Sequence, residues 1–79
     1  MVTVLCAQGF RVIIFTDDHE PAHVHVFGDG HAKINLFGFD KAPHLVWASQ
    51  MSKADIRKAM ALVTEHQHIL VAKWREIHG

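Results

Sequence analysis

The chain has 79 residues, of which 49% are hydrophobic and 20% are charged, and its eight basic and eight acidic side chains cancel. This composition is typical of a folded domain and excludes an intrinsically disordered chain. The balanced charge excludes a strong field that would steer the chain onto nucleic acid or an anionic membrane. Because no apolar run approaches the roughly 18 residues of a membrane span, we expect one membrane-free domain over residues 1–79.

The first 15 residues contain two apolar, β-branched runs, residues 2–7 and 11–15, separated by Gln8-Gly9-Phe10. This pattern predicts two strands joined by a tight turn. The first run lacks the basic flank of a signal peptide. Cys6 is the only cysteine, so no internal disulfide can form. Both observations favour a reducing, cytoplasmic location.

Residues 17–26, DDHEPAHVHV, contain three histidines and three carboxylates. Pro21 withholds a backbone donor and restricts the residue before it, so we expect a loop that ends there and a strand that begins at His23. Successive side chains of a strand point to opposite faces, which places His23 and His25 about 7 Å apart on one face and Val24 on the other. The strand therefore packs on one side and presents imidazoles on the other.

Residues 28–30, Gly-Asp-Gly, predict a hairpin turn between strands at 23–27 and 31–36. Opposed residues of an antiparallel pair share a face, so a three-residue loop with a glycine bulge keeps apolar and polar side chains apart. This register places His25 opposite Lys33 and Val24 opposite Ile34. The predicted polar face consists of His23, His25, His31, Lys33 and Asn35. The predicted apolar face consists of Val24, Val26, Ala32, Ile34 and Leu36.

The remainder of the chain predicts a short strand and helical structure. Residues 44–47 are apolar enough for a fourth or edge strand. From Ser52 the apolar residues recur at helical spacing, and Ser52 with Asp55 resembles a capping pair. A continuous helix over 52–78 would measure about 40 Å, against about 17 Å for a five-residue strand. Either the polar stretch 64–68 divides it into two helices, or its far end meets another subunit.

The fold class that follows is α+β, with an antiparallel sheet of about four strands packed against one long or two shorter C-terminal helices. We expect Trp47 and Trp74 to be core or interface residues. His66, His68 and His78 belong to a polar part of the predicted helix, and we expect them to be solvated. His66 and His68 are two positions apart, so they point in different directions and cannot chelate an ion together.

A first hypothesis for function is a metal site. Imidazole is the commonest metal ligand, and His23 and His25 share a strand face. They would bind a divalent transition metal such as Zn, Ni or Cu. The third ligand would be His19, or a carboxylate from Asp17, Asp18 or Glu20. Three protein ligands leave a coordination position open for catalysis or sensing.

A second hypothesis is metal-free phosphodiester cleavage by a small ribonuclease. One residue of the pair His23 and His25 would act as base and the other as acid, and Lys33 would stabilise charge on the phosphate. The neutral total charge is unusual for an enzyme that binds RNA. A third hypothesis is a non-catalytic interaction module, in which the histidine face and the long helix bind a partner or a second copy. Whether the protein is an enzyme stays open among the three.

Residues 9–26, GFRVIIFTDDHEPAHVHV, together with the turn at 28–30 and Ala32-Lys33-Ile34, resemble a bacterial domain-of-unknown-function family, number 4160. That family has an acidic residue with His, a proline pair, His-x-His on the next strand, and a helical segment with a late tryptophan. The matching residues here are His19, Pro21, His23, His25 and Trp74. Ala22 stands where the family usually has a second proline, which leaves the loop less rigid.

Genes of this family often lie beside a second small protein, in arrangements similar to toxin and antitoxin pairs. The resemblance therefore implies a small bacterial protein of toxin-antitoxin type with a cognate, antitoxin-like partner. It establishes no activity. A thin core and a helix longer than the sheet also favour a homo-oligomer.

Overall fold

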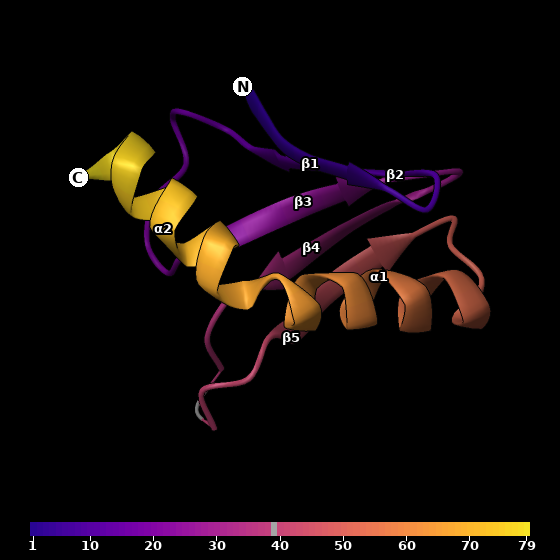
Figure 1. Ribbon diagram of the computed structural model, residues 1–79. Helices are drawn as coiled ribbons and strands as arrows, with labels where there is room; N and C mark the ends of the chain where they lie inside the picture. The colour runs from indigo at the N-terminus through magenta and orange to yellow at the C-terminus, as the bar shows by residue number, and fades with distance from the viewer. Residues whose placement is uncertain (39) are drawn as a thin grey trace.

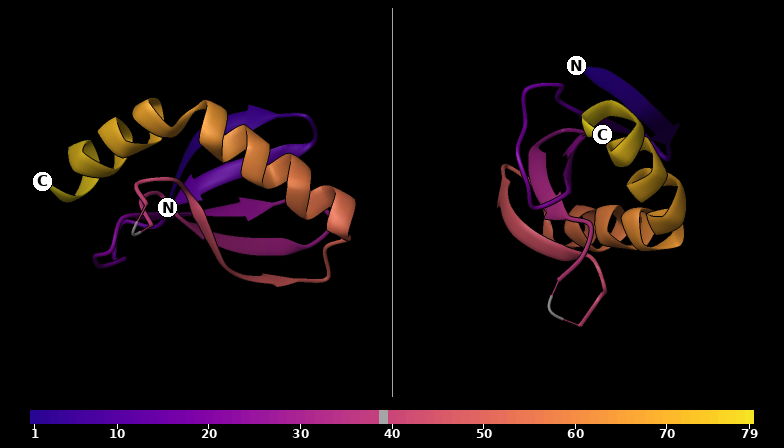
Figure 2. Two further views of the ribbon diagram at one scale, coloured as in Figure 1. Left: turned by 90° about the horizontal axis from the view of Figure 1, so that it is seen from below. Right: turned by 90° about the vertical axis from the view of Figure 1, so that its left-hand side faces the viewer.

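The computed structural model describes residues 1–38 and 40–79, and in these the chain forms five strands and two helices (Figure 1). The strands are β1 (Val2–Ala7), β2 (Phe10–Ile14), β3 (His23–Phe27), β4 (His31–Asn35) and β5 (His44–Ser49). They pair antiparallel in chain order within one sheet. The helices α1 (Lys53–Glu65) and α2 (Gln67–His78) lie on one side of that sheet (Figure 2). The α+β prediction is confirmed, with five strands where about four were expected.

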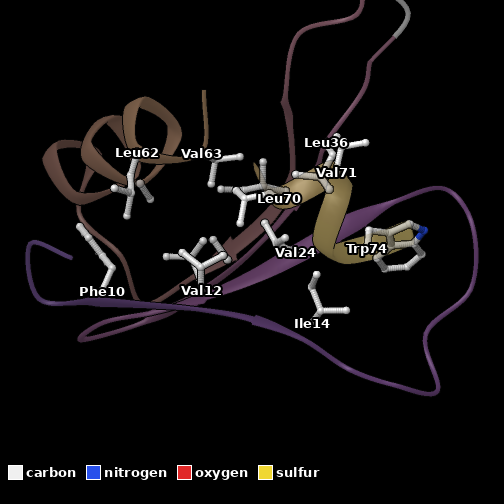
Figure 3. Packing of buried hydrophobic residues seen from close by; sticks show 14 residues of the cluster. Phe10, Val12, Ile14, Val24, Leu36, Leu62, Val63, Leu70, Val71 and Trp74 are labelled. Atoms are coloured by element: carbon white, nitrogen blue, oxygen red, sulfur yellow. The ribbon is translucent and has the colours of Figure 1, made fainter. Parts of the chain in front are cut away.

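One apolar core fills the space between the sheet and the helices (Figure 3). Alternate side chains of the central strands are fully buried in it: Val12, Val24, Val26, Ala32 and Ile34. Both helices contribute the opposite layer, with Leu62, Val63, Leu70, Val71 and Trp74. Burial of one such side chain stabilises the fold by about 1.5 to 3 kcal/mol, so this layer holds the helices to the sheet.

The central hairpin has the register that the sequence predicts. His25 lies opposite Lys33 and Val24 opposite Ile34, with a three-residue loop between the strands. The predicted glycine bulge is wrong, because the glycines described with a left-handed φ are Gly9 and Gly79. Gly30 is needed because of close packing and not because of its φ angle. A Cβ at this position would collide with the carbonyl oxygens of Ser49 and Gln50.

The first hairpin turns on two residues where three were expected. Gln8 and Gly9 have φ values of 56° and 82°, which are left-handed as in a type I′ turn. Phe10 therefore begins β2, and its side chain is buried in the core. The cap predicted at the start of α1 is present, because the Ser52 hydroxyl accepts a hydrogen bond of 3.1 Å from the backbone N–H of Asp55.

The helical segment is divided at His66, where φ and ψ are −107° and 17°. The two-helix alternative is thus the observed one. Gln67, the polar residue that interrupts the apolar spacing, donates from Nε2 to the carbonyl oxygens of Leu36 at 2.7 Å and Lys41 at 2.9 Å. This side chain ties the start of α2 to the connector between β4 and β5.

The sequence analysis predicts that two tryptophans are core or interface residues and that three histidines are solvated, and the structure confirms this only in part. Trp74 is only 2% exposed and belongs to the core, whereas Trp47 is 41% exposed on β5. His68 is exposed as expected, but His66 and His78 are half-buried, because the His66 ring contacts the Leu62 carbonyl of α1 and the His78 ring contacts the Trp74 carbonyl of α2. Neither of the described helices has the length and apolar character needed to cross a membrane.

Candidate metal centre

The loop between β2 and β3 folds back over the start of β3 and places a carboxylate beside two histidines. A turn begins this return, in which the backbone N–H of Asp18 donates to the carbonyl of Phe15 at 3.2 Å. Asp18 Oδ2 then lies 3.0 Å from His23 Nε2 and 3.6 Å from His25 Nε2. One ligand atom from each of the three residues lies within 4.8 Å of the others, so the group can surround a single ion.

The second ring nitrogen of each histidine has its own partner. His23 Nδ1 is 2.8 Å from the carbonyl oxygen of Pro21, and because that oxygen only accepts, Nδ1 carries the proton. His25 Nδ1 is 2.9 Å from Nε2 of His31. In the neutral ring of His23 the lone pair is therefore on Nε2 and faces Asp18. Metal-binding histidines show this arrangement, with the distal nitrogen held by a backbone carbonyl or another side chain.

Asp18 Oδ2 is buried and, among the described residues, accepts no hydrogen bond. It lies 3.0 Å from His23 Nε2, but that nitrogen has no proton to donate when Nδ1 carries it. An unsatisfied buried acceptor costs about 1 to 3 kcal/mol, and more when it is charged. A cation between this oxygen and the two Nε2 atoms would remove that cost.

The spacing of the three atoms also suits a tetrahedral ion. Ligands about 2.0 to 2.1 Å from zinc in a tetrahedron are about 3.3 Å apart. The two Asp18 distances, 3.0 and 3.6 Å, lie on either side of that value. If these three residues held such an ion, a fourth position would be available for a water molecule or a substrate.

Aromatic side chains enclose the histidines. His23 is only 4% exposed and its ring centroid lies 5.1 Å from that of Trp74, whose Nε1 donates to Glu20 Oε1 at 3.2 Å. His25 contacts the edge of Phe15 at 4.7 Å. The last helix therefore forms one wall of a site whose ligands come from β3 and from the preceding loop.

Burial also sets the protonation of two of these rings. Desolvation lowers the pKa of His25 below its usual 6.5, although the Asp18 carboxylate opposes this effect. Desolvation likewise lowers the pKa of His31. Both rings are therefore neutral at neutral pH, and neutral imidazole is the form that binds metal.

The structure brings together some of the predicted site residues and separates others. His23 and His25 meet Asp18, which was one of the alternative third ligands. His19 is exposed and outside this group, and with Glu20 it lines an adjoining cleft of about 220 Å³. Lys33 lies directly opposite His25 in the sheet.

Two neighbours of the site were not identified from the sequence. His31 is the partner of His25 Nδ1, and Trp74 covers His23. The predicted hairpin register already placed His31 on the same face as His25 and diagonal to it, which was a usable signal. No pattern along the chain indicates that Trp74 would reach β3.

Comparison with known proteins assigns the chain to a family. Residues 9–75 match the family described as a domain of unknown function, DUF4160. No curated protein and no solved structure matches the chain. The family match spans the candidate ligands, the central hairpin and Trp74. The chain therefore belongs to the DUF4160 family.

Proposed function

We propose that Asp18, His23 and His25 bind one divalent transition metal ion, with zinc, nickel or copper as the candidates. The observation that carries this proposal is the buried Asp18 Oδ2, which accepts no hydrogen bond among the described residues and faces two Nε2 atoms. Imidazole and carboxylate together suit these ions. His19, the alternative third ligand in the sequence analysis, gives way to Asp18 in this proposal.

The coordination favours a reactive or sensing ion over a purely structural one. Structural zinc sites have four protein ligands, whereas catalytic sites have three and a water molecule. Such an ion lowers the pKa of its bound water and polarises substrate oxygens. The protein's own residues hold the ligand rings in place, with Pro21 fixing His23 and His31 fixing His25.

Metal content of protein purified without a histidine tag tests the proposal. We expect one equivalent of zinc by elemental analysis, or one equivalent of Co²⁺ with tetrahedral absorption bands after exchange. Asp18→Asn, His23→Ala and His25→Ala should each lose stoichiometric binding, because each removes one of three ligands. His19→Ala and His68→Ala are matched controls and should keep it, since both side chains are exposed and lie outside the group.

Circular dichroism of each variant separates loss of binding from loss of folding. If wild-type protein binds no metal, or if binding survives both strand substitutions, the proposal is wrong. If His19→Ala abolishes binding while Asp18→Asn does not, the third ligand is His19. The apparent affinity should also fall below about pH 6, because protons and metal compete for the same nitrogens.

The metal-free ribonuclease stays a second candidate, because His25 and Lys33 are direct cross-strand neighbours. Its weak point is His23, which is almost fully buried and has both ring nitrogens beside protein oxygens. RNA cleavage that persists in a chelator and is lost in His23→Ala and Lys33→Gln would select this reading. Cleavage that requires added metal would exclude it.

We further infer a role of toxin-antitoxin type in the cytoplasm, with a small antitoxin-like protein as partner. The family resemblance and the lone Cys6 support this inference. Co-purification of the tagged chain with the product of the neighbouring gene is the direct test. Growth that is unaffected by expression of the chain alone would count against a toxin.

A further inference from the structure

The helices leave the other face of the sheet uncovered by helix (Figure 2), and this face is here called the open face. Strand pairing defines its members, because opposed residues share a face. One row runs Arg11, Phe27, His31. The next row runs Ile13, His25, Lys33, Trp47. The open face thus combines rings with two basic side chains, and Ile13 within it is covered, with only 1% of its surface exposed.

The charged side chains that the strands contribute are both basic, although the total charge of the chain is zero. The five strands contain Arg11 and Lys33 but no aspartate and no glutamate. The acidic residues lie in the loops and helices, where Glu76 pairs with Lys73 at 3.6 Å. Neither Arg11 nor Lys33 forms an ion pair with a described acidic residue. The open face therefore carries two basic side chains, Arg11 and Lys33, and the Asp18 carboxylate lies beside its His25.

The rings of the open face form a continuous layer across β3, β4 and β5. His31 stacks on Phe27 with centroids 4.0 Å apart and meets Trp47 edge-on at 4.7 Å. The Arg11 guanidinium lies 5.9 Å from the centre of the Phe27 ring. Trp47 is 41% exposed and is the ring most open to a ligand in this layer.

We propose that the open face binds single-stranded RNA. An unpaired base would stack on Trp47, and Lys33 and Arg11 would bind flanking phosphates, as in other sheet surfaces that combine rings with cations. Paired bases cannot stack on a protein ring, and two fixed cations are few for a duplex with one charge per roughly 1.7 Å. We choose RNA as the ligand of the open face because proteins recognise RNA mostly through unpaired bases in loops and at ends.

The open face and the candidate metal centre share His25. Its ring is 6.3 Å from Trp47 on one side, and its Nε2 faces Asp18 on the other. An RNA strand on Trp47 and Lys33 would therefore pass beside the metal. The placement of the RNA strand beside a metal ion rests on the proposed function. RNA binding itself does not, and it is measured in the presence of a chelator.

Fluorescence anisotropy of a labelled 12-residue oligouridylate with the full chain in EDTA tests the proposal. We expect saturable binding whose affinity falls as salt rises, with a log–log slope of about −1.4 for two phosphate contacts on a single strand. Lys33→Gln should halve that slope. Trp47→Ala should weaken binding about 5-fold or more, the usual loss when a stacking ring is removed.

Matched controls on the helical side make the test specific. Lys58→Gln removes the same charge and Ile69→Ala removes exposed apolar surface, and both should bind as the wild type does. The proposal is overturned if the wild type binds no oligouridylate at a protein concentration of about 10⁻⁴ M. That concentration equals the weakest dissociation constants typical of non-specific binding to nucleic acid. Equal weakening by Lys58→Gln and Lys33→Gln, or equal binding of duplex RNA, would also overturn it. Metal binding without RNA binding would reject this inference and leave the metal proposal intact.

Discussion

His25 has a polar neighbour at each of its two ring nitrogens. Nδ1 lies 2.9 Å from His31, and Nε2 lies 3.6 Å from Asp18. Desolvation lowers the pKa of both His25 and His31, so the pair stays uncharged near neutrality.

The lowered pKa values predict that apo protein loses stability as the pH falls. A histidine whose pKa is lower in the folded than in the unfolded chain binds fewer protons when folded. The free energy of unfolding is therefore highest above the unfolded pKa of 6.5 and falls as the pH drops from there through the folded values. Urea unfolding in EDTA at about pH 7.5 and about pH 5.5 measures the difference.

His31→Gln isolates the contribution of one ring in this measurement. Glutamine does not titrate, so the fall in unfolding free energy between the two pH values should be smaller in the variant than in the wild type. His68→Gln, on the exposed side of α2, should show the wild-type fall. An unchanged pH dependence in His31→Gln would contradict the prediction.

At the scale of elements, the side-chain amide of Gln67 binds the junction between α1 and α2 to the segment that follows β4. Gln67 donates two hydrogen bonds to the carbonyls of Leu36 and Lys41, which belong to the segment leaving β4. Leu70, one turn later, is fully buried against the same sheet. The bend at His66 thus lets the second helix follow the sheet and bring Trp74 to the site.

Removal of this amide should destabilise the fold without unfolding either helix. We expect Gln67→Ala to lower the free energy of unfolding by about 1 to 3 kcal/mol, because two carbonyl groups lose a donor. Denaturant unfolding measures this loss. His68→Ala, at the next and exposed position, should change stability by less than about 0.5 kcal/mol. Equal effects of the two substitutions would mean that Gln67 has no special role.

The elements that the sequence predicts correctly are those that depend on residues close together in the chain. The alternation of Val24 and Ile34 with His25 and Lys33 fixes the hairpin register, because a slip by one residue would expose the apolar face. The Ser52 cap is equally local. The helix break was left open, since the partners of Gln67 lie 31 and 26 positions away.

The candidate site was predicted only in its strand part. His23 and His25 follow from strand geometry, but the choice between Asp18 and His19 depends on how the loop folds back. That path is set by packing on Trp74, which is 54 positions from its hydrogen-bond partner Glu20. Periodicity and turn preferences contain no information at such separations.

At the scale of the whole molecule, the edge strand β5 lacks the features that prevent pairing with another chain. The sequence of β5, HLVWAS, contains no lysine, glutamate or proline of the kind that protects edge strands. Leu45, Val46 and Trp47 are each at least 39% exposed. This exposure lies at the end of the sheet farthest from β1, where no further strand is paired among the described residues.

We predict that the protein is not a stable monomer at micromolar concentration, and that β5 mediates the association. Sedimentation should give a mass above 8.9 kDa, and the thermal midpoint should rise with protein concentration. Val46→Lys should shift the protein toward the monomer, whereas Ile69→Lys on α2 should not. A monomeric mass with a concentration-independent midpoint would refute the prediction.

The contact between Trp74 and the loop before β3 also has a consequence for biosynthesis. Glu20 lies 54 positions before Trp74 and His23 also precedes it, so the ring that encloses them is translated later. Domains fold as units once their sequence is available, so the pocket stays unfinished until Trp74 has left the ribosome. A chain that terminated before Trp74 would therefore lack the enclosed histidine.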